Sequence, residues 1–153
     1  MRIVLQRVKE ARVEVEGCVA GAIGRGLLVL LGIEKEDTPA DADYLVEKIL
    51  GLRIFADDQG RMNRSVIDAS GSLLVVSQFT ICADCRKGRR PSFDRAAPPD
   101  VARKLYEYFC DSARRLGIEV QMGVFQAAMQ VHLVNDGPVT LICESPNRLT
   151  HFH

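Results

Sequence analysis

The side chains that usually carry acid–base chemistry are scarce in this sequence. Of its three histidines, His151 and His153 stand at the C-terminal end, which leaves His132 as the candidate general base. Ser77, His132 and Asp136 have the residue types of a catalytic triad, but Ser77 lacks the flanking glycines of a nucleophile elbow. The simpler interpretation of His132 is a solvated histidine on a strand, and the triad stays an alternative.

Cysteine and glycine patterns point to no bound cofactor. Cys82 and Cys85 have the spacing of a redox or zinc-knuckle pair, but Cys110 and Cys143 are isolated and supply no second pair. We therefore interpret them as incidental thiols. The glycines of residues 21–26 lack the lysine or the helix start of a phosphate-binding loop. We expect neither a metal nor a nucleotide cofactor.

A basic segment runs from Arg86 to Arg95, with five positive charges against one negative charge. The whole chain has a net charge of zero, so no global field attracts nucleic acid and any such attraction must be local. Glycine, proline and Phe93 interrupt the charges, a pattern that suits a loop gripping phosphates while the aromatic ring packs or stacks. A merely solvated charged face is the plainer alternative.

Residues 135–140, Asn-Asp-Gly-Pro-Val-Thr, are expected to form a turn between two strands. The isomer of the bond before Pro138 does not follow from sequence. If this bond were cis, two flanking carbonyl oxygens could lie nearly parallel. They would make a rigid acceptor pair able to discriminate between shapes.

Hydrophobic periodicity predicts the elements that position these segments. We expect two half-buried strands within residues 3–15, a central strand over 27–33 that is covered on both faces, and a buried strand over 73–76 that leads into Ser77–Thr80. Further strands are expected in three ranges: 118–122, 129–133 and 139–143.

Helix signals occur twice. Thr38 and Pro39 open a first helix that ends near residue 52, and Pro98 and Pro99 open a second that stops at Gly117. Asp57–Gly60 suits a hairpin turn between them. These elements predict one α/β domain over residues 1–145, with about seven strands and two long helices. A flexible tail is expected over residues 146–153.

Size and composition agree with one domain. The chain has 153 residues, of which 47% are hydrophobic, enough to bury a core. Its longest apolar run, residues 27–31, is too short to cross a bilayer, and the N-terminus lacks signal-peptide character. An odd count of five cysteines argues against a disulfide framework. We expect a cytoplasmic protein with reduced thiols.

Four segments together resemble the D-aminoacyl-tRNA deacylase family in its bacterial and eukaryotic form. They are Ser-Gln-Phe-Thr at 77–80, the Gly-Pro segment at 135–140, the apolar strand at 27–32 and Arg-Arg-Pro-Ser-Phe at 89–93. The resemblance covers about residues 1–145. The fold expected is a single α/β domain, in which a mixed, mostly antiparallel sheet or barrel-like β-structure is flanked by two long helices.

The resemblance implies a homodimer in which Gly137 and Pro138, joined by a cis bond, reach into the partner's active site. Their carbonyl oxygens would face the α-carbon of the substrate and exclude L side chains. The implied activity is hydrolysis of the ester bond of D-aminoacyl-tRNA, and also of glycyl-tRNA mischarged on tRNA-Ala. Such a site works by excluding any side chain that points in the L direction, because many different D side chains must be accepted.

The resemblance also implies a catalytic turn. The N–H groups of Phe79 and Thr80 would stabilise the oxyanion, while Ser77 and Gln78 would order the turn and the terminal adenosine. Two mechanisms are open: the hydroxyl of Thr80 attacks the ester as a nucleophile, or a water molecule attacks it. In the second mechanism the 2′-hydroxyl of the tRNA helps to activate the water. We favour the second alternative, since no base adjoins Thr80 in the sequence.

Binding residues follow from the same resemblance. Phe125 and Met129 are expected as pocket walls, and the acceptor end of the tRNA is expected on four basic residues: Arg86, Lys87, Arg89 and Arg90. The chain departs from the family pattern at Cys82, Cys85 and Ala128. Two rival functions stay open: a nucleic-acid-binding module without chemistry, and a triad hydrolase dependent on His132.

Overall fold

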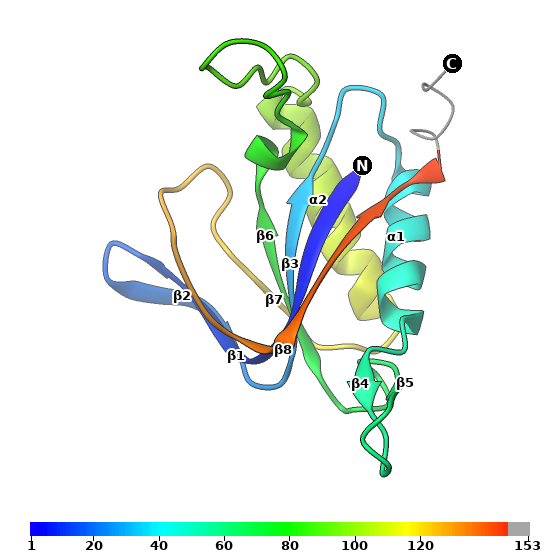
Figure 1. The fold of residues 1–153 in the computed structure, drawn as a ribbon. Helices are drawn as coiled ribbons and strands as arrows, with labels where there is room; N and C mark the ends of the chain where they lie inside the picture. The colour runs from blue at the N-terminus through cyan, green and yellow to red at the C-terminus, as the bar shows by residue number, and fades with distance from the viewer. Residues whose placement is uncertain (147–153) are drawn as a thin grey trace.

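The structure, a computed structural model, describes residues 1–146, so all but the first residue of the tail predicted over residues 146–153 lies outside the described residues. A curved six-stranded sheet carries two helices on one of its faces (Figure 1). The elements, in chain order, are β1 (Arg2–Val15), β2 (Cys18–Ile23), β3 (Gly26–Gly32), α1 (Pro39–Gly51), β4 (Phe55–Ala56), β5 (Met62–Arg64), β6 (Ser72–Ser77), the 3-10 helix η1 (Phe79–Cys82), α2 (Pro99–Arg115), β7 (Val120–Met122) and β8 (Gln130–Glu144).

Strand β1 organises the sheet, because it pairs antiparallel with β2, β3 and β8. Strands β3, β6 and β7 continue the sheet in parallel. The expected mixed, mostly antiparallel and nearly barrel-shaped sheet with two long helices is confirmed. The hairpin predicted at Asp57–Gly60 is also confirmed, as the connection between β4 and β5.

The core has two parts, one on each face of β3. Leu27, Val29 and Leu31 pack under the helices, while Leu28 belongs to a second cluster on the other face. Both faces of β3 are therefore covered, as its continuous apolar run predicts. The two helices are tied together by Asp43 of α1, whose carboxylate accepts hydrogen bonds from the hydroxyls of Tyr108 and Ser112 on α2, both at 2.9 Å.

Two sequence predictions about strands are wrong. Residues 2–15 form one strand rather than two, because β1 finds hydrogen-bonding partners along its whole length. Residues 130–144 likewise form one strand, and residues 135–140 are not a turn between two strands. In this stretch Thr140 is paired with Gln6 and Asn135 with Val8, so four residues of β8 stand opposite one residue of β1. Residues 136–139 form a bulge in β8, which we call the Gly-Pro bulge.

Candidate active site

The Ser77–Thr80 turn follows directly from the end of a buried strand. Strand β6 ends at Ser77, and the chain then enters η1. The first hydrogen bond of η1 runs from the N–H of Ile81 to the carbonyl of Gln78, at 3.4 Å. The N–H groups of Phe79 and Thr80 precede this bond, so the turn itself does not use them. The side-chain amide of Gln78 donates to the hydroxyl of Thr80 at 3.1 Å.

Close packing beneath the turn fixes its position against β3. A Cβ at Gly32 would lie 2.5 Å from Cγ1 of Ile81 and 2.8 Å from Sγ of Cys82. Only a glycine therefore fits at the end of β3 under η1. Cys82 is buried here, whereas Cys85 is exposed in the loop that follows, so the two thiols lie in different surroundings.

A hollow of about 620 Å³ lies beside the turn. Its walls come from the turn, the basic segment, the start of α2 and the loop before β8, and most of them are apolar. The lining residues are Ser77, Phe79, Phe93, Ala96, Ala97, Pro98, Pro99, Ala102, Phe125, Gln126, Ala127 and Met129. The structure thus brings together Ser77, Phe79, Phe125 and Met129, which the sequence placed in one site.

Aromatic contacts hold the walls of the hollow. The rings of Phe79 and Phe93 pack edge to face with centroids 5.1 Å apart. Phe125 lies 6.0 Å from the ring of Tyr106, whose hydroxyl donates to the carbonyl of Val75 at 2.8 Å. Burial raises the pKa of Tyr106, so its phenol stays neutral and keeps this hydrogen bond. Two parts of the wall, Phe93 and the start of α2, were not assigned to the site from the sequence.

The basic segment, whose Phe93 lines the hollow, forms a loop at the top of Figure 1. An isolated β-bridge between Asp84 and Ser92 closes it. Arg86 donates to the carboxylate of Asp84 at 2.7 and 2.9 Å, and these hydrogen bonds hold the pKa of Asp84 well below its usual value. All four basic residues, Arg86, Lys87, Arg89 and Arg90, are exposed, and of these Arg86 is already paired with Asp84.

The Gly-Pro bulge lies on the exposed side of β8. The peptide bond between Gly137 and Pro138 is cis, and both residues are exposed. Arg7 of β1 holds the base of the bulge: its Nε donates to the carbonyl of Asp136 at 3.0 Å, and Nη1 donates to the carbonyl of Ile54 at 2.6 Å. Neither Gly137 nor Pro138 is among the described residues that line the hollow.

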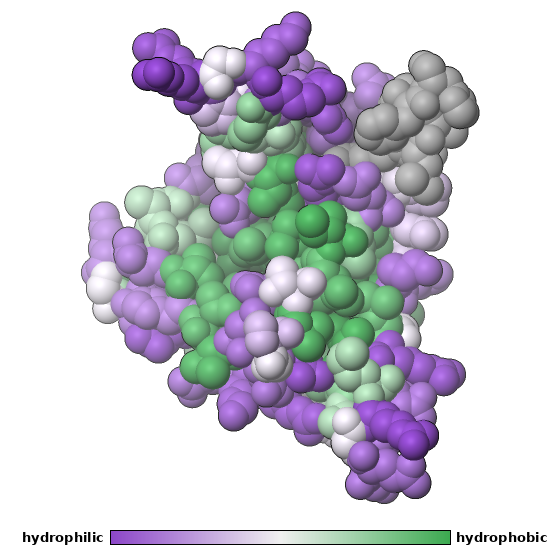
Figure 2. Space-filling model, viewed as in Figure 1, coloured by the Kyte–Doolittle hydropathy of each residue, from purple (hydrophilic) through white to green (hydrophobic). Residues whose placement is uncertain are grey.

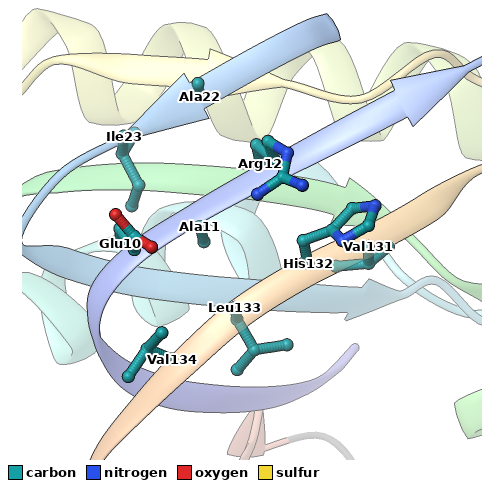
Figure 3. Close-up of a pocket in the computed structure, with 9 residues that line it drawn as sticks. All are labelled: Glu10, Ala11, Arg12, Ala22, Ile23, Val131, His132, Leu133 and Val134. Atoms are coloured by element: carbon teal, nitrogen blue, oxygen red, sulfur yellow. The ribbon is translucent and has the colours of Figure 1, made fainter. Parts of the chain in front are cut away.

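The residues of the alternative triad are not brought together. His132 stands opposite Arg12 on β1 and lines a separate pocket between β1, β2 and β8 (Figure 3). Its Nε2 lies 3.3 Å from the carboxylate of Glu14, while the carboxylate of Asp136 lies 3.6 Å from Arg7. A hydrogen bond from Arg12 lowers the pKa of Glu14, so this carboxylate stays charged beside His132.

We expect His132→Ala to keep wild-type hydrolysis of aminoacyl-tRNA, because the imidazole is directed to Glu14 and lines another pocket than Ser77 does. The initial rate of ester cleavage measures this directly. A large loss of rate, with thermal stability unchanged, would restore the triad alternative.

The fold defines the class of protein: a single α/β domain in which a nearly barrel-shaped mixed sheet carries two long helices. A solved structure titled as a probable eukaryotic D-amino acid tRNA deacylase shares the fold, with a TM-score of 0.80 at 20% identity over 94% of this chain and 98% of that chain. A structure titled c-Myc DNA Unwinding Element Binding Protein has a TM-score of 0.91 at 44% identity, over 95% of this chain and 99% of that chain.

Sequence comparison gives the particular family. The family profile described as D-Tyr-tRNA(Tyr) deacylase matches residues 4–144. A D-aminoacyl-tRNA deacylase of Geobacter sulfurreducens is 61% identical over 148 residues, 97% of each chain. One from Thermosipho africanus is 58% identical over 145 residues, 95% of this chain and 97% of that protein. The chain belongs to the D-Tyr-tRNA(Tyr) deacylase family, as the four sequence segments predict.

Among the described residues, no helix is long and apolar enough to cross a membrane.

Proposed function

We propose that this protein is a carboxylic ester hydrolase that releases the D-amino acid from D-aminoacyl-tRNA. One observation carries the proposal: a relative named D-aminoacyl-tRNA deacylase is 61% identical over 97% of this chain. The matched range, residues 4–144, includes the Ser77–Thr80 turn, the hollow and the Gly-Pro bulge.

In this reaction the N–H groups of Phe79 and Thr80 bind the oxyanion that forms when water attacks the ester carbonyl. Both groups come before the first hydrogen bond of η1 and can be aimed at a substrate. The hydroxyl of Thr80 meets the amide of Gln78, which is not a base. Activation of the water by the neighbouring 2′-hydroxyl of the tRNA is therefore favoured over attack by Thr80.

The handedness filter is the Gly-Pro bulge of a second copy of the chain. Gly137 and Pro138 are exposed and do not line the hollow of their own chain, so a partner is needed to bring them to one. Their carbonyl oxygens would occupy the direction of an L side chain. Glycyl-tRNA, including glycine mischarged on tRNA-Ala, has no side chain to exclude and would also be hydrolysed.

A homodimer is supported by the surface around the bulge. Figure 2 shows hydrophobic residues gathered over the face where β8 crosses the sheet. Val134 and Ile142, which flank the bulge on β8, are 45% and 68% exposed. A face on which exposed apolar side chains gather is stabilised when another chain covers it.

The acceptor end of the tRNA is proposed to lie along the basic loop, on Lys87, Arg89 and Arg90, with its terminal adenosine in the hollow. The loop and the hollow share Phe93, so a strand that leaves the hollow meets the loop. Because aminoacyl-tRNA is used in translation, we place the protein in the cytoplasm as a quality-control enzyme.

The proposal predicts strong stereochemical discrimination. D-Tyr-tRNA should lose its amino acid rapidly, whereas L-Tyr-tRNA should be hydrolysed at least about a thousandfold more slowly, since excluding the wrong enantiomer costs several kcal/mol of transition-state binding. Release of labelled amino acid from the two substrates at equal enzyme concentration provides the measurement. Equal rates would refute the handedness filter, and no release from either would refute the enzymatic function.

A second candidate is nucleic-acid binding without chemistry, and it is favoured by one observation. The solved relative at 44% identity is titled a DNA unwinding element binding protein. In that case Arg89→Gln together with Arg90→Gln would weaken salt-dependent binding of DNA and RNA, and Thr80→Ala would have no effect.

A further inference from the structure

Arg103 is a cation on α2 that borders the hollow. Arg103 is exposed, and its guanidinium carbon lies 4.8 Å from the centre of the Phe125 ring. Phe125 is a wall of the hollow, and so is Ala102, the residue before Arg103. The guanidinium therefore lies where the hollow meets the surface of α2.

The stacking leaves the hydrogen-bonding capacity of Arg103 unused. An aromatic ring accepts no ordinary hydrogen bond, so a guanidinium held over it keeps its N–H donors available for another partner. Asp100 and Glu107 stand one helical turn away, yet neither forms an ion pair with Arg103 in the described part of the chain. The side chain is thus held in place without a carboxylate partner, which lowers the entropy cost of binding an anion.

Not every cation of the basic segment is free of a carboxylate partner. Arg86 is paired with Asp84, and Arg95 lies 3.1 Å from the carboxylate of Glu34. A strand whose last nucleoside sits in the apolar hollow carries its nearest phosphates at the mouth, where Arg103 lies. A planar fork of donors matches two phosphate oxygens at once.

We propose that Arg103 binds a backbone phosphate of the single-stranded 3′ end of tRNA, as a second contact separate from the basic loop. This inference rests on the proposed function, because it takes the occupant of the hollow to be the terminal nucleoside. The 3′ end of the tRNA is then held by two elements, α2 and the basic loop. The ester lies between the Ser77–Thr80 turn and the mouth of the hollow.

The test uses the intact protein and an uncharged acceptor-stem minihelix ending in CCA, with binding followed by fluorescence anisotropy at several salt concentrations. Arg103→Gln should weaken binding about tenfold, the size expected for a charge-assisted hydrogen bond. The slope of log affinity against log salt should become shallower by about 0.7, the value for one phosphate on a single strand. Arg103→Lys should recover the slope and only part of the affinity.

Lys104→Gln is the matched control, since it removes one exposed positive charge from the next position of α2, and Lys104, unlike Arg103, lies over no ring among the described residues that line the hollow. Equal binding by the Arg103 and Lys104 variants, or an unchanged salt slope, would overturn the proposal. A second readout uses D-tyrosyl-adenosine, which has no 5′ phosphate. Arg103→Gln should raise KM for D-Tyr-tRNA and leave KM for this short ester unchanged. An equal rise for both would mean that Arg103 merely supports Phe125.

The two hypotheses fail differently. Wild-type protein that cleaves neither ester contradicts the proposed function, while the minihelix binding data still decide the role of Arg103.

Discussion

Replacing Gly137 by alanine is expected to lower the rate of D-aminoacyl-tRNA hydrolysis about a hundredfold, the cost of displacing a positioning group by about 1 Å. Gly137 has a φ of +134°, a conformation that L residues rarely adopt. An added Cβ would lie 2.9 Å from Cγ2 of Val139 and 3.1 Å from Nη2 of Arg7. The Gly-Pro bulge must therefore move, and its carbonyl oxygens move with it.

Single-turnover rates on D-Tyr-tRNA, together with the ratio of D to L rates, measure this effect. Gly24→Ala is a suitable control, because a Cβ at Gly24 meets no atom within 4 Å and its φ is not positive. Gly137→Ala with wild-type rate and wild-type discrimination would show that the bulge does not read the substrate.

The long-range pairing explains which parts of the fold were not predictable from sequence. Local periodicity located α1, α2, β3 and β6, since each depends on its own apolar pattern. It divided β8 at Gly137 because a glycine and a proline together are typical of turns. Residues 136–139 remain within a strand because β1 pairs with the residues on both sides of them. No local signal carries that information.

The candidate site shows the same division. Residues 77–80 were assigned to the site by the resemblance and the basic segment by its charge, so both assignments were available from the sequence. The contacts of Arg7 with the bulge and of Arg103 with Phe125 had no signal in the sequence, since an arginine in a strand or a helix looks like an ordinary surface residue. Arg7 is 129 positions away from Asp136, whose carbonyl it binds, and only the folded sheet brings the two together.

Arg7 is the residue on which the position of the Gly-Pro bulge depends most directly. It is the single β1 residue opposite the bulge, and its side chain is only 13% exposed. Its guanidinium connects the bulge to the segment between α1 and β4 through the carbonyls of Asp136 and Ile54. A lysine cannot hold both carbonyls in one fixed plane, because its ammonium is a single point donor.

We therefore expect Arg7→Gln to lower the free energy of unfolding by about 1–3 kcal/mol, the cost of leaving partly buried carbonyls without donors. Urea denaturation measures this loss. Arg12→Gln on the same strand removes an exposed pair with Glu14 and should cost less than about 1 kcal/mol. In conditions where the Arg7 variant is fully folded, its D-to-L rate ratio should fall at least about tenfold, since a mobile bulge no longer excludes L side chains. If stability falls while the ratio holds, Arg7 supports the fold alone and another group must position the filter.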